Sequence, residues 1–190
     1  MNIIVATSKN MGIGIKNKLP WTLQKELLFF KKKTIGGGNN LILMGKNTWN
    51  SLPKKPLLFR DTCVLSTTLK TNLPNTKVVK NKKEFEILVS DSFYSKIWII
   101  GGESIYKQFI DEPYVENIYL THIQSDFNCD AFFPSIPSEY KLKEVSSTII
   151  ENNVIYKHKL FSKDNVIHNH KLLSKDNVKE PKIWNSYFKS

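Results

Sequence analysis

Short apolar runs alternate with helical patterns along most of the chain. Eight runs rich in Ile, Val, Leu, Trp and Tyr predict strands at residues 2–7, 40–44, 62–66, 76–80, 97–100, 117–123, 140–148 and 153–161. Helices are predicted at residues 22–33, 45–51, 82–90 and 103–110. Asn81 is the expected cap of the third helix, and Glu84 stands at its third position.

The alternation of strands with helices predicts an α/β fold. Strands joined through helices favour a largely parallel sheet that is covered on both faces. Residues 97–100 are apolar throughout, as in a buried central strand, whereas the last two strands lack a helix between them and predict an antiparallel edge hairpin. We therefore expect one domain at residues 1–162, with a mixed, mostly parallel eight-stranded sheet flanked by four helices.

The segment after the last predicted strand has a different character. Residues 158–166, which complete that strand, nearly recur at residues 170–178 as a tandem duplication. We expect residues 163–190 to form a polar, poorly ordered tail. Trp184, Tyr187 and Phe188 leave docking on the domain or on a partner open, because disordered segments are usually poor in aromatic residues.

Composition narrows the class of protein. The chain has 190 residues, 41% of them hydrophobic, and a net charge of +11. Its lysines are scattered rather than gathered on one stripe, so we expect no nucleic-acid partner, although anionic substrates would benefit from the field. No apolar stretch is long enough to span a membrane and no signal peptide is evident. Cys63 and Cys129 are expected to be reduced thiols in a cytoplasmic setting, and no metal site is predicted.

The strongest chemical signal lies near the N-terminus. Gly12-Ile13-Gly14 is followed by Leu19-Pro20-Trp21 and then by a lone acid, Glu26. Leu23, Leu27 and Phe30 recur at helical spacing and would face a core, with Glu26 beside that stripe. Taken alone, this segment is most simply an amphipathic helix with a solvated glutamate, because buried acids are rare. A glycine loop beside one carboxylate also fits an enzyme site.

Four segments follow one another in a characteristic order: Ile4-Val5-Ala6 with the glycine loop and Leu19-Pro20-Trp21; residues 44–49, Met-Gly-Lys-Asn-Thr-Trp; residues 99–106, Ile-Ile-Gly-Gly-Glu-Ser-Ile-Tyr; and residues 119–123 with residues 130–134. In this order and spacing they resemble the dihydrofolate reductase family. Each segment is weak alone, but their common order and spacing are specific. The resemblance covers about residues 2–161.

The resemblance implies reduction of 7,8-dihydrofolate to tetrahydrofolate by NADPH. A hydride passes from nicotinamide C4 to pterin C6, and a proton is added at N5. Glu26 matches the acid that grips a ring nitrogen and the exocyclic amine of the pterin together. Trp21 and Thr121 match positions that order a proton-carrying water and brace the carboxylate; from the sequence alone, Thr121 is an ordinary strand threonine.

The family pattern also implies a substrate pocket. Arg60 matches the cation that forks around the glutamate carboxylate of folate, a role that suits arginine better than lysine. The apolar walls and pterin-edge carbonyls correspond to Ile4, Val5, Leu27, Phe30, Leu52 and Ile100.

For the cofactor, the Gly-Gly pair before a helix matches a pyrophosphate site, and its peptide bond is expected to be cis. Lys46 and Thr48 match a second phosphate contact, while Ser66 and Thr67 match the loop that receives the 2′-phosphate. Many relatives have arginine in place of Thr67, so binding of the 2′-phosphate is expected to depend more on Lys46. The cofactor residues implied are Ala6, Ile13, Gly14, Gly45, Lys46, Thr48, Ser66, Thr67, Gly101, Gly102, Glu103, Ser104, Ile105 and Tyr106.

Residues 9–18 match the mobile lid that closes over the nicotinamide, with glycines supplying the freedom to move. Asp130 matches a residue that pins this lid from a neighbouring loop, although an acid in a polar turn is the simpler interpretation.

Three alternatives stay open at this level. The reductase of riboflavin biosynthesis shares the fold and NADPH, but lacks the pairing of Leu-Pro-Trp with a helix acid. A noncatalytic paralogue or RNA-binding relative is the second. The third is a fragment of a fusion with thymidylate synthase, although no synthase motif follows. We expect a monomer that binds dihydrofolate and NADPH and does not bind a membrane. Association with thymidylate synthase stays open.

Overall fold

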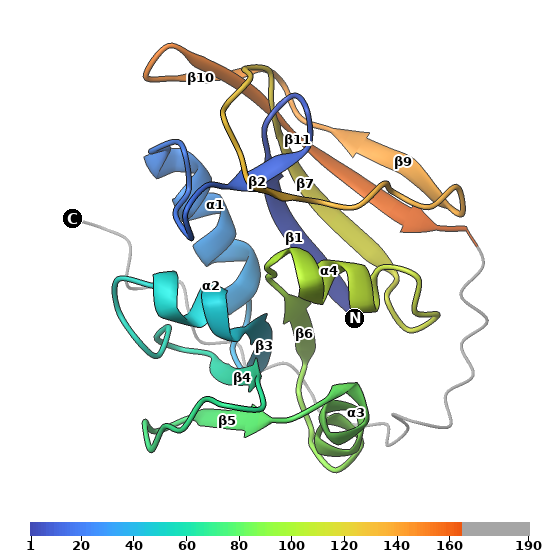
Figure 1. Cartoon of the computed structure of the whole chain (residues 1–190). Coiled ribbons are helices and arrows are strands. Elements are labelled where there is room, and N and C mark those ends of the chain that lie inside the picture. Colours follow the sequence, from blue (N-terminus) through green and yellow to red (C-terminus); the bar gives the residue numbers. More distant parts are fainter. Residues whose placement is uncertain (165–190) are drawn as a thin grey trace, which may run out of the picture.

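The computed structural model describes residues 1–164, which form eleven strands and four helices (Figure 1). The predicted tail and its second repeat lie outside the described residues. The helices are α1 (Gln24–Ile35), α2 (Lys46–Ser51), α3 (Lys82–Ser90) and α4 (Glu103–Phe109). The strands are β1 (Asn2–Thr7), β2 (Gly12–Gly14), β3 (Asn40–Gly45), β4 (Asp61–Leu65), β5 (Thr76–Val79), β6 (Lys96–Ile99), β7 (Asn117–Ile123), β8 (Ala131–Phe132), β9 (Tyr140–Val145), β10 (Ile149–Glu151) and β11 (Val154–Lys163).

The main sheet is mixed, as predicted. Its order is β10-β11-β7-β1-β6-β3-β4-β5, and β9 also pairs with β11. All pairs from β7 through β1, β6, β3 and β4 to β5 are parallel, whereas β11 is antiparallel to β7, β9 and β10. The buried strand β6 lies between β1 and β3, which confirms its predicted central place.

Two details of the strands differ from the prediction. The run expected at residues 140–148 contains only β9, which ends at Val145, and β10 follows it as a strand that was not predicted; the two pair with different lengths of β11. The short strands β2 and β8 form a separate two-stranded sheet that was not predicted. Their few residues, including Gly12 and Gly14, carry no period-two apolar pattern, so only the tertiary pairing makes them strands.

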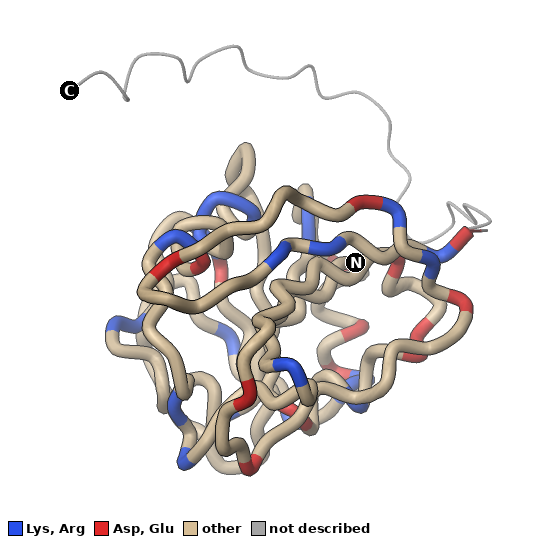
Figure 2. The backbone as a smooth tube through the Cα atoms, turned by 90° about the horizontal axis from the view of Figure 1, so that it is seen from above, with Lys and Arg blue, Asp and Glu red and all other residues tan. Residues whose placement is uncertain are grey.

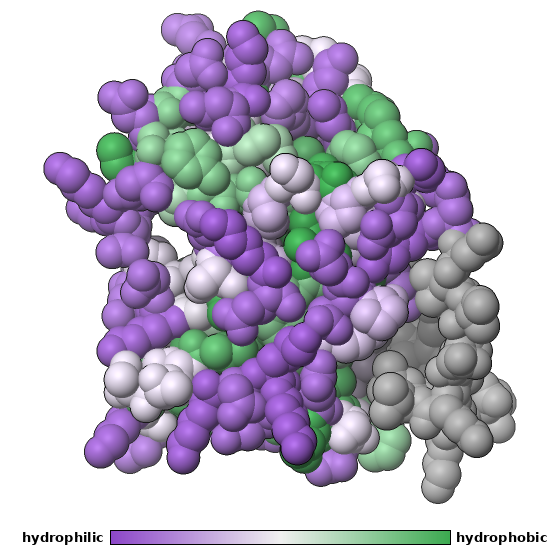
Figure 3. All heavy atoms as spheres, turned by 45° about the vertical axis from the view of Figure 1, so that its right-hand side comes forward, coloured by the Kyte–Doolittle hydropathy of each residue, from purple (hydrophilic) through white to green (hydrophobic). Residues whose placement is uncertain are grey.

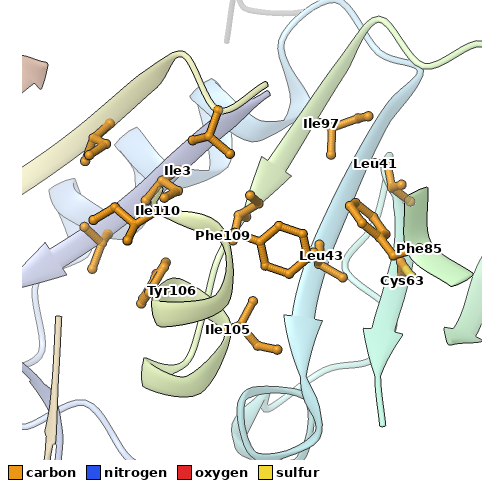
Figure 4. Close-up of a cluster of buried hydrophobic side chains, with 14 of the residues drawn as sticks. Ile3, Leu41, Leu43, Cys63, Phe85, Ile97, Ile105, Tyr106, Phe109 and Ile110 are labelled. Atoms are coloured by element: carbon orange, nitrogen blue, oxygen red, sulfur yellow. The ribbon is translucent and has the colours of Figure 1, made fainter. Parts of the chain in front are cut away.

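Alternate residues of the central strands enter different cores. Ile3, Leu43 and Cys63 point into a cluster under α3 and α4, which Figure 4 shows together with Phe85 and Phe109 of those helices. Their chain neighbours Ile4, Met44 and Val64 join a second cluster that includes residues of α1 and α2. Because side chains alternate across a strand, continuous apolar runs produce two cores and a sheet covered on both faces.

Helix ends are held by side chains, one of them distant in sequence. Asn81 caps α3 by accepting a hydrogen bond from the Glu84 N–H at 2.9 Å, which confirms the predicted cap. Helix α1 begins two residues later than predicted. The Glu151 carboxylate, from β10, accepts hydrogen bonds from the backbone N–H groups of Gln24 and Lys25 there. This contact across the fold replaces a local capping residue.

The surface is polar and its charges are dispersed. Figure 2 shows Lys and Arg positions spread around the backbone and interspersed with acids. In the face drawn in Figure 3, apolar residues form limited areas between hydrophilic ones. No helix within residues 1–164 is long and apolar enough to cross a membrane. Both cysteines are free, and burial raises the pKa of the Cys63 thiol to about 12.

Candidate active site

A cleft of about 290 Å³ opens beside the carboxyl ends of β1 and β6. Ligands of open α/β sheets usually bind at this end, where neighbouring strands connect in different directions. Most predicted substrate residues and part of the predicted cofactor set line the cleft: Ile4, Val5, Ala6, Ile13, Gly14, Glu26, Leu27, Phe30, Thr48, Leu52, Ile100, Gly102 and Tyr106. The cleft therefore brings together residues from the N-terminal strand, the loop after it, three helices and the Gly-Gly turn.

The apolar stripe of α1 faces the cleft more than the core. Leu27 is 49% exposed and Phe30 is half-buried, although the sequence pattern predicted a core position for both. Leu23, just before the helix, is the member of the stripe that is fully packed. A stripe that lines a ligand cleft has the same helical spacing as one that covers a core, so periodicity cannot distinguish them.

Glu26 is a buried acid in the cleft wall. Its side chain is 5% exposed, and its Oε1 accepts a hydrogen bond from the Thr121 hydroxyl at 3.2 Å. Burial raises the pKa of Glu26 to about 7, the Thr121 hydrogen bond opposes the rise, and the negative charge of Glu151 adds to it. The simple interpretation of a solvated glutamate is therefore wrong, and the carboxyl exchanges its proton near neutral pH.

Thr121 and Trp21 stand behind the cleft wall. Thr121 lies on β7, opposite His158 of β11, and its Oγ1 is 3.0 Å from His158 Nδ1. Trp21 packs edge-on against Phe127, with ring centroids 5.3 Å apart. The buried Trp21 Nε1 has no hydrogen-bond partner among residues 1–164. A buried N–H without a partner can donate to a water or a ligand, so this site offers an unused donor.

Arg60 lies below the cleft, against the last turn of α1. It is 7% exposed; its Nη1 donates to Thr34 Oγ1 at 2.6 Å and its Nε donates to the Leu58 carbonyl at 3.1 Å. Burial lowers the pKa of Arg60 to about 10, which leaves the guanidinium charged at neutral pH. No carboxylate within residues 1–164 forms an ion pair with it. A largely buried cation without an acid partner retains donors for an anionic ligand.

The Gly101-Gly102 turn is shaped for close approach of backbone. Its peptide bond is cis, as expected, and Gly101 has a φ of +101°. A Cβ at Gly101 would lie 2.7 Å from the Tyr106 ring, and one at Gly102 would lie 3.3 Å from Thr48 Oγ1. The missing side chains let the chain pass between α2 and α4 and leave room at the cleft, which suits a pyrophosphate.

A second polar cluster joins the start of α2 to the loop after β4. Lys46 Nζ donates to Thr68 Oγ1 at 2.7 Å. Ser66 Oγ accepts from the N–H groups of Thr68 and Leu69, at 3.2 and 3.0 Å, while Thr67 is exposed. The loop is therefore preorganised, with a lysine at one side and hydroxyl groups along it.

Several predicted cofactor residues on α4 do not line the cleft. Ile105 of α4 is buried in the core, where Figure 4 shows it. A Cβ at Gly45 would lie 3.0 Å from Ile105 Cγ1, so the two residues pack closely. Glu103 accepts from the Phe132 N–H at 3.0 Å and pairs with Lys107, while Ser104 is exposed. Tyr106 is the exception: it lines the cleft, and its hydroxyl donates to the Ile4 carbonyl at 2.9 Å.

The loop after β1 is held by a tight turn and by one acid. Ile15 and Lys18 exchange two backbone hydrogen bonds of 2.9 Å, and Lys16 and Asn17 between them have positive φ. Gly12 and Gly14 have ordinary φ; a Cβ at Gly12 would lie 2.4 Å from the Cys129 sulfur. At Gly12 the missing side chain therefore allows close packing against Cys129, and the freedom of movement expected from these glycines stays a prediction. Asp130 accepts from the Lys16 N–H at 2.8 Å.

Some lining residues escaped the sequence analysis. Leu19, Asn47, Ser51 and Ala131 line the cleft, and Asn17 and Lys18 were predicted only as part of the lid. Asn47 and Ser51 lie one helical turn apart on α2, beside the predicted Thr48 and Leu52, so helix geometry could have found them. Ala131 belongs to the motif at residues 130–134 but was given no role, because only the β2–β8 pairing brings it to the cleft.

Comparison with known proteins agrees with this geometry. A family model described as "Dihydrofolate reductase" matches residues 1–163. A dihydrofolate reductase of Drosophila melanogaster is 34% identical over 176 residues, covering 85% of this chain and 97% of the relative. One of Buchnera aphidicola is 40% identical over 142 residues, covering 75% and 81%, and one of Bos taurus is 35% identical over 182 residues, covering 86% and 97%.

Proposed function

Because the chain belongs to the dihydrofolate reductase family, and so reduces dihydrofolate with a nicotinamide cofactor, we propose that the cofactor is NADPH and that Glu26 controls the proton. NADPH, when bound, supplies the hydride that passes to C6 of the pterin. The family membership removes the alternative of a riboflavin-pathway reductase, and turnover of dihydrofolate by the purified protein would remove that of a noncatalytic paralogue. What remains is the role of each residue.

Glu26 is proposed to bind the pterin and to govern its protonation. A carboxylate can accept from a ring N–H and from the exocyclic amine side by side. With its pKa raised to about 7 by burial, the group can also hold a proton at neutral pH. Trp21 Nε1, which has no partner among the described residues, is proposed to donate to the water that carries the proton to N5.

The remaining folate contacts follow from the cleft walls. Leu27, Phe30 and Leu52 present apolar surface for the pterin and benzoyl rings, together with Ile100 on the opposite side. Arg60 is proposed to bind the glutamate carboxylate, because it is charged, largely buried and free of an acid partner among residues 1–164.

NADPH is proposed in preference to NADH because of the polar cluster beside α2. Lys46 contributes a cation, and Ser66 and Thr68 contribute hydroxyl groups to the loop that it contacts. A 2′-phosphate would gain charge-assisted hydrogen bonds there, which the 2′-hydroxyl of NADH cannot match. The close-packed Gly101-Gly102 turn supports a pyrophosphate site, since its backbone can approach a ligand without side-chain obstruction.

The loop at residues 9–18 is proposed to act as a lid over the nicotinamide. Asn17 and Lys18 line the cleft, and the Asp130 carboxylate holds the neighbouring Lys16 N–H. A hydrogen bond to one backbone group can hold a loop closed and still break in each cycle.

We also propose that the chain acts as a monomer, which light scattering on the purified protein tests. Association with thymidylate synthase stays a prediction.

The observation that carries the proposed role is the burial of Glu26 against Thr121. The test measures loss of NADPH absorbance with dihydrofolate, and NADPH binding by fluorescence, for Glu26→Gln. We expect turnover at neutral pH to fall by roughly two orders of magnitude or more, with NADPH binding retained. Glu144→Gln, on the exposed strand β9, is the matched control and should behave as the unmodified protein. Full turnover of Glu26→Gln would exclude the proposed role.

A further inference from the structure

His158 extends the hydrogen-bonded chain that ends at Glu26. It lies directly opposite Thr121 in the β7–β11 pair, strands that run side by side in Figure 1. Its Nδ1 is 3.0 Å from Thr121 Oγ1, and the same Oγ1 is 3.2 Å from Glu26 Oε1. Three side chains from β11, β7 and α1 therefore form one continuous polar line behind the cleft.

The His158 ring is held firmly in this position. It stacks on Phe29 of α1, with centroids 3.7 Å apart and planes 14° apart, and meets Tyr156 edge-on. Its backbone N–H donates to Ser146 Oγ at 3.0 Å, and its carbonyl accepts from the Ser146 N–H at 2.8 Å. Two aromatic contacts and two backbone hydrogen bonds limit the ring to the face that Thr121 occupies.

A hydroxyl group has one hydrogen, so Thr121 cannot donate to both neighbours at once. When Glu26 is ionised, Thr121 donates to it and must accept from His158, which then carries hydrogen on Nδ1. When Glu26 is protonated and donates to Thr121, the hydroxyl hydrogen turns to His158 Nδ1, which must be bare. Only a group that can both donate and accept satisfies Thr121 in the two states, and imidazole is such a group.

We infer that His158 is a positioning residue for the proton step: it changes tautomer when Glu26 gains or loses its proton, and acts on Glu26 only through the Thr121 hydroxyl. This inference rests on the proposed role of Glu26 and deepens it. The proton balance is simple. As Glu26 is protonated, one proton enters at Nε2, the Nδ1 hydrogen moves to Thr121 Oγ1, and the Thr121 hydrogen moves to Glu26 Oε1. Thr121 and His158 end neutral, and Glu26 has gained one proton.

The far side of the ring can exchange with solvent. Nε2 has no hydrogen-bond partner within the described part of the chain, and it is not among the four fully buried side-chain atoms that lack one. The ring is half-buried, so its other nitrogen reaches water. Solvent can therefore supply or remove the Nε2 hydrogen that the tautomer change requires.

The titratable groups around the pair keep their protonation states near neutral pH, whereas Glu26 changes its protonation and His158 its tautomer. Burial and the Lys33 ammonium lower the pKa of His158, which keeps the ring neutral there. Burial raises the pKa of the tyrosines that face the pair, Tyr106 of α4, Tyr119 of β7 and Tyr156 of β11. Glu151 of β10 stays ionised: although burial opposes it, hydrogen bonds from Lys25, Tyr156 and Gln24 lower its pKa.

The first test follows the His158 ring nitrogens by ¹⁵N NMR in the full chain, from about pH 5 to 9. We expect hydrogen on Nδ1 above the Glu26 midpoint and on Nε2 below it, with the Glu26 carboxyl carbon titrating in parallel. In Glu26→Gln this exchange should disappear. A ring that keeps one tautomer while Glu26 titrates overturns the inference, as does an exchange with the same midpoint in Glu26→Gln.

The second test uses His158→Phe, which preserves a ring to stack on Phe29 but removes both nitrogens. Protonated Glu26 then loses the acceptor for the Thr121 hydrogen, whereas ionised Glu26 keeps its donor. The pH midpoint of turnover should fall by roughly 0.5 to 1 unit, and the KM for dihydrofolate on the acid side should stay nearly constant. His122→Phe, a histidine of β7 that contacts Lys159 instead, is the matched control.

Coupling separates a positioning role from general damage. If His158 acts through Thr121, then His158→Phe should shift the midpoint much less in a Thr121→Val background. Equal shifts of the pH midpoint in both backgrounds would refute the coupling of His158 to Glu26 through Thr121. These outcomes differ from failure of the Glu26 role itself, which shows as full turnover of Glu26→Gln whatever the His158 nitrogens do.

Discussion

The free energy of unfolding of Glu26→Gln, compared with that of the original chain, should increase as the pH rises. The carboxyl is 5% exposed, and its pKa rises from 4.5 to about 7 on folding. A raised pKa means that the folded state prefers the protonated form. The stability associated with the group is thus complete below pH 4.5 and is lost as the pH rises through about 7.

The size of the effect follows from the shift. Each pKa unit corresponds to about 1.36 kcal/mol, so ionising Glu26 costs the folded state about 3 kcal/mol at pH 8. Gln carries no charge and avoids this cost. Its other effects, such as a changed hydrogen bond with Thr121, are nearly independent of pH. The stability gained by Glu26→Gln should therefore increase by about 3 kcal/mol between pH 4.5 and 8, or roughly 5–10 °C in Tm.

Urea unfolding of the ligand-free proteins at a series of pH values measures this difference directly. Glu151→Gln is a control with the opposite sign, because the pKa of Glu151 is lowered on folding and its stabilisation is lost as the pH falls. If the free energies of unfolding of the original chain and Glu26→Gln change in parallel across this pH range, folding does not raise the pKa of Glu26. That result would refute the reasoning.

Four further substitutions test other parts of the site. Lys46→Met should raise the KM for NADPH about tenfold and leave that for NADH nearly unchanged, because the lysine contacts Thr68 in the loop after β4, where the 2′-phosphate is proposed to bind; equal changes would contradict this. Arg60→Lys should raise the KM for dihydrofolate about tenfold but not that for a pterin lacking glutamate, which steady-state kinetics would detect. Asp130→Asn weakens the hydrogen bond to the Lys16 N–H, and stopped-flow measurements should show lid closure slowed or less complete, roughly two- to tenfold. Gly101→Ala places a methyl group 2.7 Å from the Tyr106 ring, so calorimetry should show a loss of about 2–3 kcal/mol and weak NADPH binding.

The sequence determined the fold to a large extent, because its signals are local. Apolar runs of strand length and amphipathic helical stretches act within a few residues, and they placed the central strands and all four helices to within two residues. The Asn81 cap follows the same logic. The cleft residues were found differently, from motifs whose order matches a family, and most of those predicted to contact substrate do line one cleft.

Only the tertiary structure decided the electrostatics of the site. Glu26 is buried because β7 lies beside it, and the partner that it meets there, Thr121, is 95 residues away in sequence. His158 enters the same line through the pairing of β11 with β7, and Glu151 caps α1 from β10. Burial and long-range pairing depend on the whole chain at once, whereas helical and strand periodicity depends on neighbours. A sequence therefore reveals which residues are present at a site before it reveals the protonation state in which they work.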